Sequence, residues 1–147
     1  MKPKDYVKLE FPITLPDFDF VYAAIQHFAF QLNPSRKELQ DIKVAVSEAI
    51  SNSCLHAYPV EDGPVIIKCS VPKPFVLEIE IKDKGIGIED VDKARKMLST
   101  SIVGYSGLGF TVMEDLMDEV IVKSKPGKGT TVRMRKTITG KLKNKWV

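Results

Sequence analysis

The chain has 147 residues, of which 44% are hydrophobic and 28% are charged, and its formal net charge is +3. These values are typical of one globular domain with a real core, and no apolar run approaches the roughly 20 residues needed to cross a membrane. The N-terminal Met-Lys-Pro-Lys-Asp is not followed by an apolar stretch, so no secretion signal is predicted. We therefore expect a single domain over residues 1–147, located in the cytoplasm and without membrane contact.

The charged tail and the cysteines are not expected to carry chemistry. Three lysines in the last seven residues account for the net charge, and the segment 137–147 is predicted to be a basic, solvated tail. It lacks interleaved aromatic residues and a recognition helix, so no direct nucleic-acid contact is expected. Cys54 and Cys69 do not form a Cys-x-x-Cys motif and are predicted to be free, half-buried thiols.

The first third of the chain is predicted to form a strand and two helices. Residues 8–13 alternate between polar and apolar and indicate a short edge strand that ends at prolines. Apolar residues at helical spacing predict a helix from about 17 to 32, which Asn33-Pro34 breaks. Ser35-x-x-Glu38 is a capping-box pattern and predicts the start of a second helix.

Three polar residues follow one another at four-residue spacing along this second helix: Glu48, Asn52 and His56. Each lies about 40° further around the helix than the last, so the three line one side of it. That side adjoins the apolar stripe of the helix. A polar row at the edge of a buried face looks into a cleft more readily than into bulk water.

The second half of the chain predicts strands and short helices. The expected elements are strands at 65–71 and 75–81, a charged helix at about 89–98, a flexible loop at 99–106, a helix at 107–117, and a closing hairpin of strands at 119–123 and 130–135. Clean alternation in the 75–81 strand predicts a sheet with one buried face. This order of elements predicts an α+β fold, a two-layer α/β sandwich with a mixed, mostly antiparallel sheet and helices on one face.

The polar row on the second helix has the chemistry that ATP transfer needs. Asn52 offers an oxygen ligand for Mg²⁺, which prefers hard oxygens. Glu48, one turn earlier, can accept a proton from an attacking hydroxyl or water. His56 is equally consistent with holding the end of the helix by a hydrogen bond to backbone. Taken alone, Glu48 would also fit an ordinary surface carboxylate.

Asp83-x-Gly85-x-Gly87 follows the alternating strand at 75–81. Asp83 could accept a hydrogen bond from an exocyclic amine such as adenine N6, and the two glycines would let backbone pass close to a flat ring. By itself the pattern also fits a polar turn after a strand. The longer glycine pattern of a dinucleotide-binding fold is absent.

Ser106-Gly107-Leu108-Gly109 leads into the next predicted helix. Free N–H groups and the positive end of the helix dipole at such a start suit phosphate. Thr130 opens the last strand after a glycine and could share a water with Asp83, although threonine is also simply favoured in strands.

Taken in order, these motifs resemble the N box, the two glycine boxes and the final Gly-Thr of the Bergerat-fold (GHKL) ATPases, which include gyrase B, MutL and sensor histidine kinases. The resemblance is strongest to the anti-sigma-factor serine/threonine-protein kinases of the SpoIIAB and RsbW type. The segments 46–58 and 107–118 carry it, and the similarity covers about residues 8–136.

The resemblance implies that the chain binds MgATP, sequesters a sigma factor, and passes the γ-phosphate to a serine of a small anti-sigma-factor antagonist of the STAS type. It also implies a homodimer. It assigns Glu48 as the general base, Asn52 as the Mg²⁺ ligand and Asp83 as the adenine contact. The further nucleotide contacts that it implies are Gly85, Gly87, Ser106, Gly107, Leu108, Gly109 and Thr130, with 99–109 as a lid over ATP.

Tyr105 departs from this pattern, because relatives often carry an arginine there that faces the terminal phosphate. Tyrosine cannot supply a fixed positive charge; Lys96 or an arginine of a partner is an alternative source. Three hypotheses stay open: the kinase and anti-sigma factor, an ATP-binding regulatory module that captures a protein partner without phosphotransfer, and the ATP-binding half of a phosphorelay.

Overall fold

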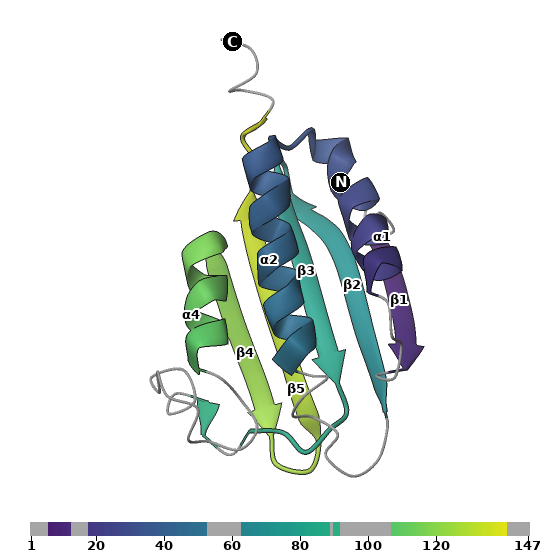
Figure 1. Ribbon diagram of the computed structural model, residues 1–147, viewed down its shortest axis with the longest axis vertical. Helices are drawn as coiled ribbons and strands as arrows, with labels where there is room; N and C mark the ends of the chain where they lie inside the picture. The colour runs from purple at the N-terminus through teal and green to yellow at the C-terminus, as the bar shows by residue number, and fades with distance from the viewer. Residues whose placement is uncertain (1–5, 13–17, 53–62, 89, 92–106, 141–147) are drawn as a thin grey trace.

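The computed structural model describes residues 6–12, 18–52, 63–88, 90–91 and 107–140 (Figure 1). Its elements are β1 (Tyr6–Pro12), α1 (Asp19–Ala29), the 3-10 helix η1 (Phe30–Leu32), α2 (Arg36–Asn52), β2 (Pro64–Lys73), β3 (Val76–Asp83), α4 (Gly107–Leu116), β4 (Glu119–Lys125) and β5 (Gly129–Thr137). No helix in these ranges is both long and apolar enough to span a bilayer.

The strands form one five-stranded sheet in the order β1-β2-β3-β5-β4, and β1 is an edge strand as predicted. All four pairings between the described strands are antiparallel, so the expected mixed character of the sheet is corrected to antiparallel. The reason is the crossover from β3 to β4. These two strands point the same way in Figure 1, but β5 returns between them and separates what would have been a parallel pair.

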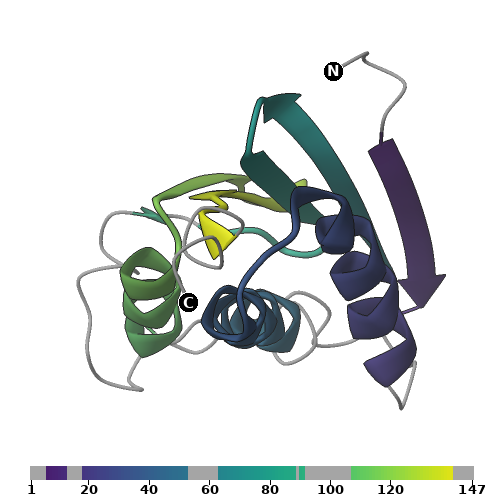
Figure 2. The ribbon, with the colours of Figure 1, turned by 90° about the horizontal axis from the view of Figure 1, so that it is seen from above.

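The helices α1, α2 and α4 all lie on one face of the sheet, which confirms the predicted two-layer α+β sandwich (Figure 2). The core fills the space between the layers. Its largest fully buried side chains are Phe110, Ile25, Ile42, Ile67, Leu77, Ile79, Ile81, Met113, Met134, Val21, Val46 and Val65. Every second residue of β3 is buried, so the alternation in the sequence corresponds to the face that the helices cover.

The predicted boundaries needed small corrections. The first helix begins at Asp19 and ends at Ala29 with a 3-10 turn after it. Asn33 ends that turn with a φ of 54°, a left-handed conformation that asparagine tolerates. Phe75 was predicted as the first residue of a strand, but it lies in the turn before β3 with a φ of 65°. Each strand after β1 extends further than its alternating pattern predicted.

Cys69 is fully buried in β2 rather than half-buried as predicted, and it is a free thiol. Burial away from water raises the pKa of this thiol to about 12. The thiol therefore stays protonated at neutral pH and behaves as a small apolar side chain. Cys54 lies outside the described residues.

The capping box at the start of α2 also holds the C-terminal segment. Ser35 Oγ accepts the Glu38 N–H at 3.1 Å, and the Ser35 N–H donates to Glu38 Oε1 at 2.9 Å, as the sequence predicted. Glu38 Oε2 then accepts the Thr139 N–H at 2.7 Å. A side chain at Gly140 would overlap the backbone of Ser35. The segment after β5 is thus docked on α2.

This docking corrects the predicted extent of the basic tail, which was expected to begin at residue 137. Thr137 is the last residue of β5, and Ile138 is buried with its N–H bonded to the Phe75 carbonyl at 2.7 Å. Apolar packing and backbone hydrogen bonds therefore continue to residue 140. The charge pattern of the sequence could not reveal them, because the docking partner is 100 residues away.

We expect Glu38→Gln to lower the free energy of unfolding by about 1–2 kcal/mol at pH 7, because the neutral amide has one acceptor oxygen for the two backbone N–H groups that the carboxylate accepts. Burial of Glu38 raises the pKa of its carboxyl, but hydrogen bonds from Ser35 and Thr139 outweigh burial, so the net pKa lies below its ordinary value. The stability it contributes is therefore present above the unfolded pKa of about 4.3 and is lost as the pH falls through the lower, folded pKa.

Urea unfolding of the wild type and Glu38→Gln across pH 7 to 3 measures both effects. The difference between the two proteins should shrink as the pH drops. Glu119→Gln, at a half-exposed carboxylate in a long ion pair, is the control and should behave like the wild type. If the difference in unfolding free energy between the two proteins stays constant down to pH 3, the charge of Glu38 is not what stabilises its contacts with Ser35 and Thr139.

Candidate functional site

Four chain segments that are distant in sequence meet at one end of the sandwich. The last turn of α2, the end of β3, the start of α4 and the start of β5 all lie at the lower end of the molecule in Figure 1. These segments contain the predicted residues Glu48, Asn52, Asp83, Gly109 and Thr130. The predicted motifs therefore lie toward the same end of the sandwich.

Asn52 is the most informative residue of this end. It is the last residue of α2 and is only 6% exposed, yet its Nδ2 has no hydrogen-bond partner among the residues that the structure describes. An unsatisfied buried amide costs about 1–3 kcal/mol, and such groups in native proteins usually have a functional explanation. A polar ligand that contacts this amide would supply one.

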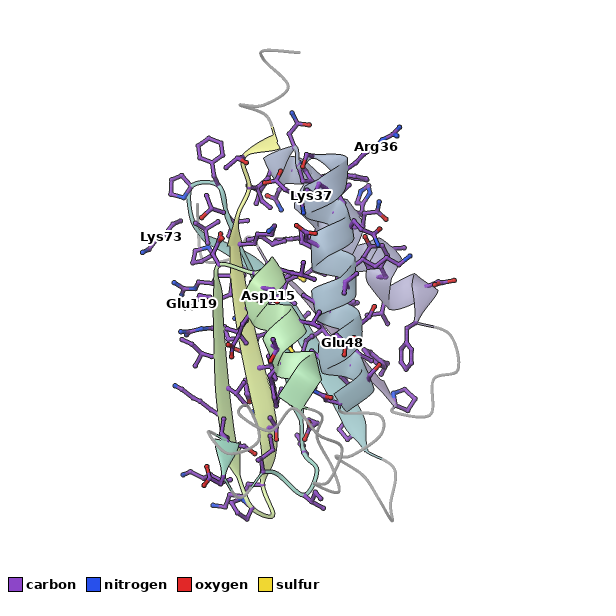
Figure 3. The ribbon with its side chains drawn as sticks, turned by 60° about the vertical axis from the view of Figure 1, so that its left-hand side comes forward. Arg36, Lys37, Glu48, Lys73, Asp115 and Glu119 are labelled. Atoms are coloured by element: carbon purple, nitrogen blue, oxygen red, sulfur yellow. The ribbon has the colours of Figure 1, made fainter. Side chains whose placement is uncertain are left out.

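Gly109 brings α4 against this part of α2. A Cβ at position 109 would lie 3.2 Å from Glu48 Oε2 and 3.6 Å from both Asn52 Oδ1 and Nδ2. Figure 3 shows Glu48 on the lower half of α2, beside the first turn of α4. The glycine thus leaves the carboxylate, the amide and the helix start in one place, where a side chain would fill the gap.

The start of α4 is held by its own apolar residues. Phe110 and Met113 are completely buried on the face that packs against the core. This packing fixes the first turn of α4, and the positive end of a helix dipole suits an anion. Gly107 and Leu108 lie in this turn as predicted, although their side chains are outside the described set.

Asp83 is the second centre of the site. It ends β3, is 2% exposed, and accepts two backbone hydrogen bonds on Oδ1, from the Gly85 N–H at 3.0 Å and from the Thr130 N–H at 3.1 Å. The first bond forms the turn after β3, and the second ties that turn to β5. Asp83 and Thr130 are therefore neighbours, as predicted, and the contact between them is direct.

The glycines of the Asp83 segment serve backbone packing. Gly87 has a φ of 78°, and a side chain there would overlap the Lys125 carbonyl in the β4–β5 turn. Gly129 has a φ of 100°, and a side chain there would overlap the Asp83 carbonyl. The Gly127 N–H donates to the Ile86 carbonyl at 2.7 Å across the same contact. Gly87 was predicted to pack beside a nucleotide; the structure also gives it this independent reason to be glycine.

Ser124 is a residue of this region that the sequence did not single out. Its hydroxyl accepts the Ile88 N–H at 2.6 Å and lies 3.0 Å from the Gly129 carbonyl and 2.7 Å from Thr130 Oγ1. Nothing in the pattern Val-Lys-Ser-Lys-Pro distinguishes it from an ordinary polar residue at the end of an edge strand. For Gly129 the sequence offered one weak indication of a structural role, because this glycine stands directly before two threonines at the start of a predicted strand.

Several predicted features lie outside the described residues. They are His56, Lys96, Tyr105, Ser106 and the 99–106 part of the expected lid. The described residues thus bring together Glu48, Asn52 and Gly109 as one group, and Asp83, Gly85 and Thr130 as another. In the first group, the Glu48 carboxylate and the unsatisfied Asn52 Nδ2 lie beside the start of α4. In the second group, the buried Asp83 carboxylate is hydrogen-bonded to the backbone of Thr130, which carries a hydroxyl.

The sequence matches the family model described as "Histidine kinase-like ATPase domain" over residues 13–136. The chain belongs to this family. The matched range contains every residue of both groups.

Curated relatives resemble the chain over nearly their whole length. The "Anti-sigma F factor" of Clostridium acetobutylicum is 42% identical over 132 residues, which are 88% of this chain and 92% of that protein. The "Anti-sigma F factor" of Caldanaerobacter subterraneus subsp. tengcongensis is 42% identical over 144 residues, which are 94% of this chain and 97% of the relative.

Solved structures with low sequence identity share the fold. One contains the RsbU and RsbW domains of a Mycobacterium tuberculosis protein, with a TM-score of 0.65 at 15% identity. It matches 90% of this chain, which spans about a third (32%) of that longer one. The histidine kinase domain of a blue-light activated histidine kinase from Erythrobacter litoralis has a TM-score of 0.60 at 22% identity, covering 83% of this chain and 63% of that one.

We expect Asn52→Leu to stabilise the free protein by up to about 1 kcal/mol, because an apolar side chain of similar shape replaces an amide without a partner. We also expect MgATP to raise the melting temperature of the wild type but not that of Asn52→Leu, because the variant lacks the polar side chain that a nucleotide complex could contact. Thermal unfolding with and without MgATP measures both.

Ser51→Ala, at the exposed neighbouring position, is the control and should keep the MgATP response. If Asn52→Leu is strongly destabilised without nucleotide, the amide has a structural partner and its burial is not evidence for a ligand.

Proposed function

We propose that the chain is an anti-sigma factor with serine-protein kinase activity. It binds MgATP, sequesters a sigma factor, and phosphorylates a serine of a small anti-sigma-factor antagonist of the STAS type. The observation that carries this proposal is the buried Asn52 amide beside the Glu48 carboxylate and the start of α4. It stands in a chain that is 42% identical, over nearly its whole length, to proteins named "Anti-sigma F factor".

The two groups of the site divide the nucleotide between them. Asp83 accepts a hydrogen bond from the exocyclic amine of adenine, and its own position is fixed by the Gly85 and Thr130 N–H groups. The first turn of α4 receives the phosphates through its backbone N–H groups. Asn52 Oδ1 would hold Mg²⁺, which in nucleotide sites typically keeps several waters and is also bound by phosphate.

A magnesium ion at this position would neutralise phosphate charge during transfer. The fit of the residues to it is supported by the Asn52 side chain, which is buried and, like the Glu48 carboxylate, lies close to where a Cβ at Gly109 would stand. A hard oxygen ligand next to a helix start that can hold phosphate is the donor set that Mg²⁺ uses in nucleotide sites.

Glu48 is the general base. As the serine oxygen of the antagonist forms its bond to the γ-phosphorus, the bond between that phosphorus and the β,γ-bridging oxygen breaks and ADP leaves. The serine proton passes to Glu48. The carboxylate is partly exposed at the edge of the buried face, so a substrate hydroxyl can reach it while its helix remains rigid.

The partners follow from the relatives and from the surface of this chain. The relatives are named "Anti-sigma F factor", which supports a sigma factor as the sequestered protein, and the location that we propose is the cytoplasm. The proposed homodimer is supported by the edge strand β1 and by Phe20 and Phe30, which are 71% and 51% exposed on the adjoining α1 and η1. Exposed apolar side chains beside a free sheet edge are typical of protein contacts.

The competing function is partner capture without phosphotransfer, which the sequence favours at one position. Tyr105 stands where the resemblance expects an arginine, so that position does not supply the positive charge. Stoichiometric phosphoserine on the antagonist would exclude the competing function.

We expect Glu48→Gln to lower the rate of phosphoserine formation on the cognate antagonist by about 10²–10⁴-fold, the usual contribution of a positioned general base. Affinity for MgATP should change little, because the amide keeps the shape of the side chain. Rates come from radiolabelled phosphate transfer, and affinities from calorimetry. Glu119→Gln at the far end of the sheet is the control, and equal transfer by both variants would refute the role of Glu48.

We expect Asp83→Asn to weaken ATP binding by about 1–3 kcal/mol while the protein stays folded. Its oxygen can still accept the two backbone N–H groups, but an NH₂ group replaces an acceptor that the adenine amine needs. Asp118→Asn is a matched control, since Asp118 also accepts a backbone N–H, from Thr137 at 2.6 Å, but far from the site. Unchanged ATP affinity in Asp83→Asn would remove this residue from the site.

A further inference from the structure

Lys136 is a buried lysine on the face of β5 that the helices cover. It is 9% exposed and follows Val132 and Met134 in the alternation of that strand, so it shares the buried side of the strand with them. Lysine is rarely buried unless its charge is paired. The mechanism proposed above makes no use of this charge, so its role in the molecule has to be explained.

The ammonium of Lys136 has partners on two different helices. Its Nζ donates to the carbonyl oxygen of Leu116, the last residue of α4, at 2.7 Å. It also lies 3.7 Å from Asp41 Oδ2 on α2, close enough for an ion pair. The last carbonyls of a helix lack partners within it, and the negative end of the helix dipole favours a cation there. Lys136 therefore connects β5 with the end of α4 and with α2.

The helices α2 and α4 pack against each other and run in opposite directions, and the candidate site lies where α2 ends and α4 begins (Figure 1). At that end a Cβ at Gly109 would lie 3.6 Å from the Asn52 amide. Leu116 is about two turns along α4 from Gly109, and Asp41 is about three turns along α2 from Asn52. Lys136 thus bridges the two helices at the end of the pair that is remote from the site.

The bridge supplies a constraint that apolar packing does not. Phe110 and Met113 hold α4 on the core, but hydrophobic contact is non-directional and permits small shifts of a helix across its neighbour. A hydrogen bond from a charged group is stronger than a neutral one and has a defined length and direction. At Lys136 this directional contact reaches α4 and the ion pair reaches α2, so the spacing of the two helices is set there.

We propose that Lys136 is a positioning residue that holds α4 at the spacing from α2 at which its first turn receives the phosphates of the nucleotide. The inference rests on the proposed function, in which the phosphates meet α4 and the purine lies at Asp83. The purine end does not use the bridge, because the Gly85 and Thr130 N–H groups hold Asp83. Thr130 is about 20 Å from Lys136 along β5. Loss of the bridge therefore weakens contacts to phosphate and spares contacts to the purine.

The test compares ATP with adenosine, which has the purine and the ribose but no phosphate. NMR titrations of the full chain with Mg²⁺ give both dissociation constants for the wild type and for Lys136→Met, in which an uncharged side chain of similar length replaces the lysine. We expect Lys136→Met to weaken ATP binding about threefold to tenfold and to leave the dissociation constant of adenosine unchanged. A lysine that only stabilises the fold would leave both constants of the folded protein unchanged.

Asp41→Asn is a second variant, which keeps the inference testable if Lys136→Met does not fold. It removes the charge on α2 that pairs with the lysine and leaves the bond from Lys136 to Leu116 in place. We expect it to weaken ATP binding by less than Lys136→Met does, again without an effect on adenosine. In the double variant the two effects on ATP should be less than additive, because both changes break one bridge.

Two control variants remove a cation close to the bridge. Arg135 donates to Glu78 Oε1 at 2.7 Å, but it alternates with Lys136 along β5 and so lies on the face of the sheet away from the helices. Lys37, labelled at the start of α2 in Figure 3, is the exposed second ion-pair partner of Asp41. Arg135→Met and Lys37→Met should both bind ATP and adenosine as the wild type does.

The outcomes distinguish the inference from the function beneath it. ATP binding that is unchanged in Lys136→Met or in Asp41→Asn, or that weakens in step with adenosine, overturns the role of Lys136 and leaves the proposed function standing. An equal loss of ATP binding in Arg135→Met also overturns that role. A wild type that binds ATP no more tightly than adenosine overturns the proposed function and the inference together.

Discussion

The hydrogen bond from the Thr130 N–H to the Asp83 carboxylate joins the two strands on which the purine end of the site is built. Asp83 is the last residue of β3, and Thr130 follows the first residue of β5. The carboxylate also accepts the Gly85 N–H, so the chain turns sharply as it leaves the sheet. Because the carboxylate satisfies backbone groups from two segments, it is held in place without help from a ligand. Close backbone contacts at Gly87 and Gly129 hold the same two segments together.

Asn52, at the other end of the site, differs from Asp83 in how well its hydrogen-bonding groups are satisfied. Asp83 is satisfied by the protein, whereas Asn52 Nδ2 is buried without a partner in the described part of the chain. A rigid, satisfied group suits recognition of a flat base, and an unsatisfied group suits a ligand that arrives with its own polar atoms. Natural proteins often give up stability at functional sites in this way. In the proposed function, the satisfied carboxylate would hold the base and the unsatisfied amide would meet the phosphate end of the nucleotide.

The sequence predicted the layers, the edge strand, the capping box at Ser35, and the convergence of Glu48, Asn52, Asp83 and Thr130, because periodicity and short motifs are local signals. It did not predict the roles of Ser124 and Gly129, nor the hydrogen bond between Glu38 and Thr139. Each of these depends on a contact between distant segments, and the residues themselves have no distinctive local pattern. The sheet was expected to be mixed and is antiparallel in the described strands, because β5 lies between β3 and β4.

A crystal structure with Mg²⁺ and a non-hydrolysable ATP analogue tests the central claim most directly. The account predicts the purine amine against the Asp83 carboxylate, Mg²⁺ on Asn52 Oδ1, and the triphosphate at the first turn of α4, with Glu48 facing the terminal phosphate. A nucleotide bound at another surface, or one bound here with Asn52 contacting neither metal nor phosphate, would contradict it.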